Sequence, residues 1–179
     1  MEEGKVSKFY ENKTVFITGA TGFMGKVLVE KLLRSTKVRK IYLLIRPKES
    51  HHNNVDKDMY IFSNFVLLQS IKIDVLMKRG VETKVRLQDL MSAKIFDHLK
   101  DSKADRLADV EVVTGDITKE NFGLSEADIR TLVEEVEIVF HSAATIRFDE
   151  KLTEAVKLNV GAVYSLIKLC KMMEKLQVI

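Results

Sequence analysis

The sequence lacks tryptophan and has a single proline and a single cysteine among its 179 residues. One cysteine excludes an internal disulfide framework. Cys170 lies on the apolar side of an expected helix, which favours a buried structural thiol over a nucleophile. With one cysteine and only four histidines, of which His51 and His52 belong to a polar loop, we expect no metal site.

Long apolar runs and a large excess of one charge are also lacking. The formal net charge is +3, and the basic residues are interspersed with acidic ones, which is typical of a solvated surface and excludes a nucleic-acid partner from our expectations. No run reaches the ~20 apolar residues of a membrane-spanning helix. The first residues carry no apolar core of a signal peptide. We therefore expect no membrane span and an intracellular, cytosol-facing location.

The most informative stretch is TVFITGATGFMG at 14–25, where three glycines follow a short apolar run at three-residue spacing. Gly19 permits a tight turn, Gly22 lets the backbone approach a pyrophosphate, and Gly25 lets the next helix pack closely. The N–H groups at the start of that helix attract phosphate charge. The pattern predicts a dinucleotide site, with a purely structural turn as the alternative.

Strand and helix patterns alternate along the chain. Apolar runs predict strands at 15–17, 40–45, 110–114 and 137–141, and 176–179 resembles the opening of a fifth. This succession predicts an α/β fold, a Rossmann-type doubly wound parallel sheet with the first strand central and an incomplete C-terminal end. We expect one dinucleotide-binding domain over 1–179.

Three helices are expected between these strands. In the first, from Phe23 to about Arg34, Glu30 is expected to face solvent. Its expected apolar face is Met24, Val27, Leu28 and Leu32. Ser125 is the expected N-cap of a second helix that runs to about Val136, with Asp128 at the reciprocal position. A long helix begins at Leu152, and its expected apolar face is Ala155, Val156, Val163, Leu166, Ile167, Cys170 and Met173.

The candidate ligand-binding residues, at 19–25, 46, 116 and 142–145, fall at the carboxyl ends of the expected strands, where ligands bind in such sheets. About 20 residues after the glycines, NAD sites have an acid that binds the ribose 2′-hydroxyl, whereas an arginine suits a 2′-phosphate. Arg46 occupies this position, with Lys48 close behind and Glu49 nearby. We therefore expect NADPH as the cofactor in preference to NADH. The alternative is a surface arginine at a strand end.

Several motifs, in order, resemble those of alcohol-forming fatty acyl-CoA reductases, which belong to the extended short-chain dehydrogenase/reductases. They are TGATGFMGKVLVEKLLR at 18–34, IYLLIRPK at 41–48, RLQDL at 86–90, IFDHL at 95–99, GDIT at 115–118, HSAAT at 141–145 and NVG at 159–161. The resemblance implies NADPH-dependent reduction of long-chain fatty acyl-CoA to a primary alcohol. It also implies a peroxisomal or endoplasmic reticulum membrane location for a full-length protein.

By this resemblance, Asp116 and Ile117 would lie against the adenine and 142–145 along the central part of the cofactor, while Asn159 would be structural. The expected cofactor-binding residues are Gly19, Thr21, Gly22, Phe23, Met24, Gly25, Arg46, Asp116, Ile117, Ser142, Ala143, Ala144 and Thr145.

The chain departs from the family pattern in two places. Residues 49–78 lengthen the usual spacing, either as a genuine insertion or as translated non-coding sequence; a helix docked on a partner or membrane is a third interpretation. The family's catalytic Tyr-x-x-x-Lys pair follows a fifth strand, whereas Tyr164 and Lys168 follow the fourth, so we do not assign them a catalytic role. We expect the catalytic pair beyond Ile179 and an inactive fragment. Alternatives are another extended reductase or epimerase, or an inactive cofactor-binding remnant.

Overall fold

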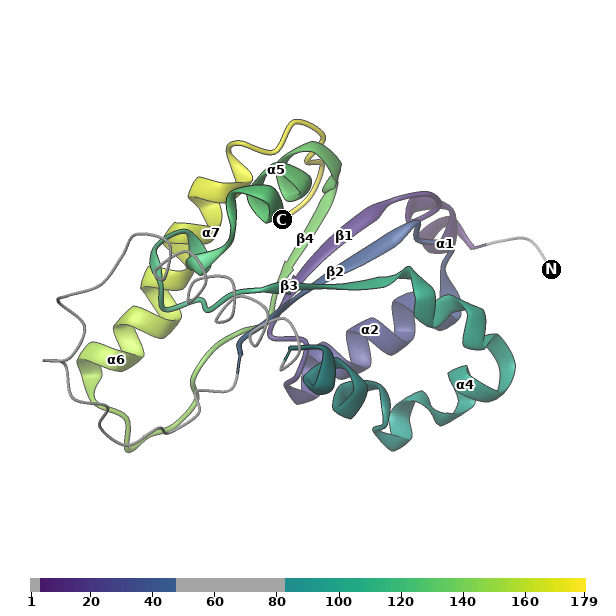
Figure 1. Cartoon of the computed structure of the whole chain (residues 1–179), viewed down its shortest axis with the longest axis horizontal. Helices are drawn as coiled ribbons and strands as arrows, with labels where there is room; N and C mark the ends of the chain where they lie inside the picture. The colour runs from purple at the N-terminus through teal and green to yellow at the C-terminus, as the bar shows by residue number, and fades with distance from the viewer. Residues whose placement is uncertain (1–3, 48–82) are drawn as a thin grey trace, which may run out of the picture.

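The computed structural model describes residues 4–47 and 83–179, which form a parallel sheet covered by helices on both faces (Figure 1). The strands are β1 (Thr14–Thr18), β2 (Lys40–Ile45), β3 (Val110–Thr114) and β4 (Ile138–His141). Their order is β3-β2-β1-β4, all pairs are parallel, and β1 is central. The predicted Rossmann-type arrangement with a central first strand is confirmed.

The helical elements lie between and around these strands (Figure 1). The α-helices are α1 (Lys5–Phe9), α2 (Phe23–Ser35), 83–91, α4 (Asp97–Lys103), α5 (Glu126–Glu135), α6 (Leu152–Val156) and α7 (Ala162–Cys170). Short 3₁₀ segments are η2 (Lys94–Phe96), η3 (Ala104–Asp109) and η4 (Glu120–Gly123), and η5 (Lys157–Gly161) is a π-helix. None of the helices in this described part of the chain has the length and apolar character needed to cross a bilayer.

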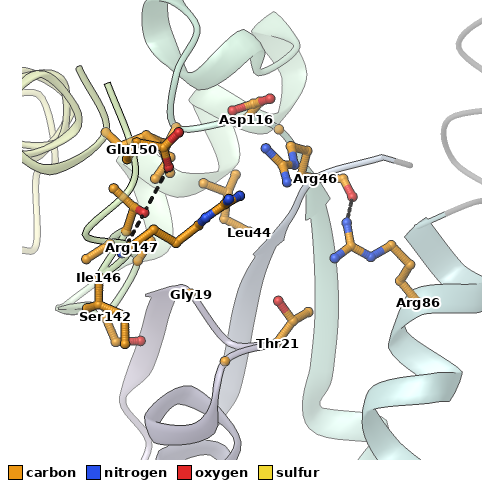
Figure 2. A pocket seen from close by; sticks show the side chains of 17 residues that line it. Gly19, Thr21, Leu44, Arg46, Arg86, Asp116, Ser142, Ile146, Arg147 and Glu150 are labelled. Carbon is orange, nitrogen blue, oxygen red and sulfur yellow. Dashed lines mark hydrogen bonds between the residues drawn. The ribbon is translucent and has the colours of Figure 1, made fainter. Parts of the chain in front are cut away.

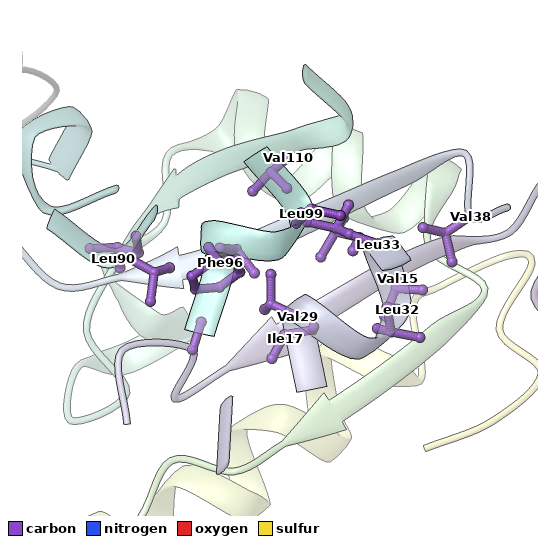
Figure 3. Close-up of a cluster of buried hydrophobic side chains, with 14 of the residues drawn as sticks. Val15, Ile17, Val29, Leu32, Leu33, Val38, Leu90, Phe96, Leu99 and Val110 are labelled. Carbon is purple, nitrogen blue, oxygen red and sulfur yellow. The ribbon is translucent and has the colours of Figure 1, made fainter. Parts of the chain in front are cut away.

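Two hydrophobic cores lie on opposite faces of the sheet, because successive side chains of a strand alternate between faces. Val15 and Ile17 of β1 contribute to the first core, with α2 and α4 (Figure 3). Phe16 contributes to the second core, with α5 and α7. All five residues of β1 are buried, as expected for a strand covered on both sides. Continuous apolar runs in the sequence therefore identified the strands correctly.

Helix α2 faces the sheet with a different set of residues from the one we predicted. Its buried residues are Gly25, Val29, Glu30, Leu32 and Leu33. Met24 is 66% exposed, so its predicted place on the apolar face is wrong. Gly25 packs directly on the Gly19–Ala20 turn, and this contact fixes the rotation of the helix and directs Met24 outward. Glu30, expected in solvent, is buried and accepts a hydrogen bond from Arg34 Nε at 2.6 Å.

The predicted cap of α5 is confirmed, because the Asp128 amide donates to Ser125 Oγ at 3.0 Å. The long helix begins at Leu152 as predicted, but its expected apolar face is only partly buried. Leu166 and Cys170 are buried, whereas Val156, Val163 and Ile167 are 48%, 38% and 41% exposed. The π-helical segment η5 adds one residue to a turn and rotates the preceding residues away from the face that α7 buries. In α7, which follows η5, the apolar face is wider than the surface that packs against the sheet, so Val163 and Ile167 remain partly exposed.

The chain after α7 returns to the free side of β4. Val139 N donates to Val178 O at 2.9 Å, and Ile138 and Val178 form a parallel bridge. This single bridge lies within the predicted opening of a fifth strand, although the described residues form a four-stranded sheet. Cys170 is buried in the second core, where burial raises the pKa of its thiol to about 11, as expected for a structural cysteine.

Glu137 joins the start of β1 to the start of β4. Its carboxylate accepts hydrogen bonds from Lys13 Nζ at 2.8 Å and from Thr14 N at 3.0 Å. Burial alone would raise the pKa of Glu137, but these two hydrogen bonds and the positive charges of Lys13 and Arg39 together outweigh it, and the pKa is lowered. A carboxyl with a lowered folded-state pKa stabilises the fold above its unfolded pKa, and this stabilisation is lost as the pH falls through the folded-state pKa.

We therefore expect Glu137→Gln to cost about 1.5–3 kcal/mol at pH 7, the range for a hydrogen bond to a charged group, and less in acid. Urea unfolding between pH 3 and pH 7 would measure this, with the exposed Glu134→Gln as the control. An equal cost for Glu137→Gln at both ends of the range would show that its charge does not contribute.

Candidate functional site

A pocket of about 620 Å³ opens at the carboxyl ends of the strands (Figure 2). Its lining comes from the end of β2, from the loops after β1, β2, β3 and β4, and also from the helix at 83–91 and from η5. The lining residues are Gly19, Thr21, Gly22, Leu44, Arg46, Arg86, Gly115, Asp116, Ile117, Ser142, Ala143, Ala144, Thr145, Ile146, Arg147, Glu150 and Leu158. The structure thus brings together every residue predicted to bind the cofactor except Phe23, Met24 and Gly25.

The loop after β1 presses against the loop after β4 with no room for a side chain. Gly19 has φ +75°, and a Cβ there would lie 2.5 Å from Ala143 N and 2.6 Å from Ser142 C. The Gly22 amide donates to Gly19 O at 3.0 Å and closes the turn. Only glycine fits at position 19, so the turn is a cradle of backbone groups at the wall of the pocket.

Helix α2 begins immediately after this turn. Its N-cap, Gly22, makes no side-chain capping hydrogen bond, so the first-turn N–H groups remain available to a ligand. The side chains of Phe23 and Met24 are 80% and 66% exposed and lie outside the pocket lining. Any contribution they make to ligand binding would come from their backbone amides. Gly25 is buried against Gly19 O and provides close packing, as its spacing predicted.

The loop after β4 is fixed to its neighbours by hydrogen bonds. Ser142 donates twice to Thr18 O, from N at 3.2 Å and from Oγ at 2.9 Å. His141 Nδ1 lies 2.6 Å from Thr18 Oγ1, and burial lowers the pKa of this imidazole, which favours its neutral form at pH 7. Asn159 donates to Thr145 O and accepts from Thr145 N, both at 2.9 Å. The structural role expected for Asn159 is therefore that of holding Thr145 in the wall of the pocket.

The loop after β3 brings a buried carboxylate to the pocket. Asp116 is 8% exposed. Its Oδ1 accepts from Thr118 N at 2.9 Å and from Thr118 Oγ1 at 2.8 Å. These bonds fix the side chain, while Ile117 supplies an apolar surface beside it. A polar group next to an apolar ledge can accommodate a flat heteroaromatic ring.

Three arginines line the pocket. Arg86 Nη1 donates to the carbonyl oxygen of Arg46, which joins the helix at 83–91 to the end of β2 (Figure 2). In the figure Arg46 stands between Asp116 and Arg86. A smaller cavity of about 160 Å³ adjoins this point and is lined by Thr21, Lys26, Arg86, Asp89 and Leu90. Two arginines thus lie near the end of β2, where their guanidinium groups suit a phosphate group.

The sequence predicts Arg46 at the site but does not point to Arg86 or Arg147. Arg86 belongs to the RLQDL motif, whose resemblance indicates only a helical link; its position near the end of β2 depends on tertiary packing. Arg147 pairs with Asp149 at 2.9 Å, and this hydrogen bond raises the pKa of the exposed guanidinium. No spacing rule links either residue to the glycine motif.

Tyr164 and Lys168 lie outside the pocket lining. Tyr164 is 62% exposed, and Lys168 Nζ lies 4.6 Å from the centre of its ring. The two side chains therefore interact with each other at the helix surface, and neither lines the pocket.

With this geometry established, comparison with known proteins defines the family. The sequence profile of an NAD-binding family described as Male sterility protein matches residues 17–64 and 60–179. The chain belongs to this family. Its cofactor is accordingly a nicotinamide dinucleotide. The possible insertion at 49–78 lies entirely outside the described residues, and the two matched segments overlap within it.

Curated relatives are similar over almost the whole chain. Fatty acyl-CoA reductase 1 of Xenopus laevis is 37% identical over 97% of this chain, and that of Homo sapiens is 36% identical over the same share. Fatty acyl-CoA reductase wat of Drosophila melanogaster is 35% identical over 95%. The chain spans 28%, 28% and 27% of the length of these three relatives.

Solved structures show the same fold. The reductase domain of a nonribosomal peptide synthetase from Mycobacterium tuberculosis has a TM-score of 0.60 and is 28% identical, covering 94% of this chain and 32% of that one. The terminal R domain of the myxalamid pathway has a TM-score of 0.59 at 23% identity, covering 94% and 34%, which is a likeness of fold alone. The predicted Rossmann-type class is thus supported both by the strand order of this chain and by its similarity to solved structures.

Proposed function

We propose that this male sterility family chain binds NADPH for a fatty acyl-CoA reductase that converts long-chain acyl-CoA to a primary fatty alcohol. The observation that carries the proposal is the pocket itself, where the glycine cradle, the Asp116 loop, the Arg46–Arg86 pair and the loop at 142–145 meet. Similarity to fatty acyl-CoA reductases over 97% of the chain supports the reaction class.

Each part of the pocket suits a different part of the dinucleotide. The first-turn amides of α2 would hold the pyrophosphate, and Gly22 would let it approach the backbone. Asp116 and Ile117 would hold the adenine, and the loop at 142–145 would lie along the centre of the cofactor toward the nicotinamide. Arg46 and Arg86 would bind the 2′-phosphate, with the hydrogen bond to the Arg46 carbonyl oxygen orienting the Arg86 guanidinium.

When bound, NADPH would supply the hydride for each of the two reductions, from thioester to aldehyde with release of CoA and from aldehyde to alcohol. The chain's own residues hold the dinucleotide and shape one wall of the site. Among the described residues, the pocket lining contains no tyrosine, lysine or histidine to provide the proton that the alcohol oxygen requires. We therefore propose that the chain contributes cofactor binding and shows no turnover when it is assayed alone.

Cofactor preference gives a direct test of this proposal. A guanidinium–phosphate hydrogen bond contributes about 1.5–3 kcal/mol, which corresponds to roughly 10- to 100-fold in affinity. We expect Arg46→Ala and Arg86→Ala each to weaken NADPH binding by this factor and to change NADH binding by less than about threefold. Fluorescence titration of the reduced cofactors would measure both affinities.

Arg130→Ala is the matched control, because Arg130 is exposed on α5 and lies outside the pocket lining. Its NADPH affinity should equal that of the unmodified chain. If the unmodified chain bound NADH as tightly as NADPH, the preference for the phosphorylated cofactor would be withdrawn. If it bound neither, the proposed function would fail as a whole.

A further inference from the structure

Three consecutive residues between β3 and α5 have left-handed backbone conformations. Asn121, Phe122 and Gly123 have φ values of 47°, 57° and 59°. Glycine adopts this region readily and asparagine tolerates it, but it is uncommon for a bulky residue such as phenylalanine. Such strain persists only where the surrounding structure compensates for it, and it is found preferentially at functional sites.

The Phe122 side chain provides the compensation. It is 0% exposed and packs in the second core. The Phe122 amide donates to Lys119 O at 3.0 Å, and this hydrogen bond closes the turn. A left-handed residue therefore directs an aromatic ring into the core and leaves its carbonyl oxygen pointing back toward the end of β3.

The Phe122 carbonyl oxygen connects the turn to the residues that line the pocket. The Asp116 amide donates to Phe122 O at 2.7 Å. A Cβ on Gly115 would lie 2.7 Å from the same oxygen and 2.7 Å from Leu44 Cδ1, so the turn packs on the backbone just before Asp116. Gly115, Asp116 and Ile117 all line the pocket, whereas Phe122 does not.

We infer that the left-handed turn at 121–123 positions the part of the pocket that receives the adenine, with Phe122 as the positioning residue. Its carbonyl oxygen fixes the Asp116 amide, and this sets the direction of the backbone that carries the Asp116 carboxylate and the Ile117 side chain. The inference rests on the proposed dinucleotide site and adds a residue that makes no contact with the ligand.

Asn121 allows the turn to be tested without changing the core. Its side chain is exposed, so substitutions there alter the backbone preference and leave buried area unchanged. Asn121→Val introduces a β-branched residue that strongly disfavours the left-handed region, and Asn121→Gly is the matched control that accepts it. We expect Asn121→Val to weaken binding of adenosine 2′,5′-bisphosphate, the adenine half of NADPH, by about tenfold. Asn121→Gly should stay within twofold, and neither variant should alter binding of nicotinamide mononucleotide.

Hydrogen exchange provides a second readout that does not depend on activity. We expect Asn121→Val to increase exchange at the Asp116 amide and to leave the amides of β1 and β2 protected. Gly123→Ala serves as a milder second variant if Asn121→Val does not fold, because a Cβ there would lie 3.2 Å from the flexible end of Lys119. It should shift the same two measurements in the same direction.

Two results would overturn the inference while the proposed function stands. One is equal binding of adenosine 2′,5′-bisphosphate by Asn121→Val, Asn121→Gly and the unmodified chain. The other is a loss of protection spread evenly over β1, β2 and the Asp116 loop, which would make the turn a general stabilising element. Failure of the unmodified chain to bind either NADPH or adenosine 2′,5′-bisphosphate would overturn the proposed function and this inference together.

Discussion

Gly19→Val is expected to abolish dinucleotide binding and to destabilise the fold by about 3 kcal/mol or more, because two costs add at this position. The first is conformational, since a left-handed φ of +75° costs a residue with a Cβ roughly 1–2 kcal/mol. The second is steric, since that Cβ would lie within 2.7 Å of backbone atoms of Ser142 and Ala143. Neither contact can be relieved by a side-chain rotation, so the loops after β1 and β4 must separate.

Two other glycines provide graded controls. Gly4→Ala should change nothing, because a Cβ there has no neighbour within 4 Å. Gly22→Ala should melt close to the unmodified chain but bind NADPH more weakly, because its Cβ would lie 3.3 Å from Gly19 O and would enter the pocket lining. Thermal melting and cofactor titration measure the two effects separately. Unchanged NADPH binding by Gly19→Val would mean that the dinucleotide binds elsewhere.

Phe16→Ala is expected to destabilise the fold by about 3–5 kcal/mol, the usual cost of deleting a fully buried aromatic side chain. Phe16 is 0% exposed at the middle of the central strand, and its ring belongs to the core that contains Leu166 and Phe122. For a chain of this length, each kcal/mol lowers the melting temperature by about 2–4 °C. The expected fall is therefore about 6–20 °C.

Phe9→Ala is the matched control, because Phe9 is 44% exposed, belongs to neither core and makes an edge contact with Tyr10 at the margin of the first core. Its effect should remain below about 1 kcal/mol. Urea unfolding of the three proteins would give the free energies directly. Similar losses for Phe9→Ala and Phe16→Ala would contradict the assignment of Phe16 to the second core.

The sheet could be predicted from the sequence because strands buried on both faces carry continuous apolar runs. The run at 40–45 ends at Arg46 and Pro47, and its boundaries agree with β2. Helix faces are harder to predict, since periodicity shows which residues could be buried and not which neighbours are present. Met24 was expected on the buried face of α2, but close packing at Gly25 turned it outward.

The site was predictable to the extent that it follows strand ends. Parallel strands bring their carboxyl ends to one edge, so the order of the strands alone places Gly19, Arg46, Asp116 and Ser142 together. Arg86 and Phe122 could not be predicted, because their roles depend on contacts across the fold. Arg86 donates to a carbonyl oxygen 40 positions away in the sequence, and Phe122 acts through its backbone oxygen.

Because Cys170 is buried, the rate at which its thiol is alkylated reports how often the surrounding structure opens. The protein has one cysteine, it is 3% exposed, and a thiol with a pKa of about 11 is almost wholly protonated at neutral pH. An alkylating reagent can therefore modify it only while α7 is lifted from the sheet. The labelling rate then measures how often α7 detaches from the face of the sheet opposite α2.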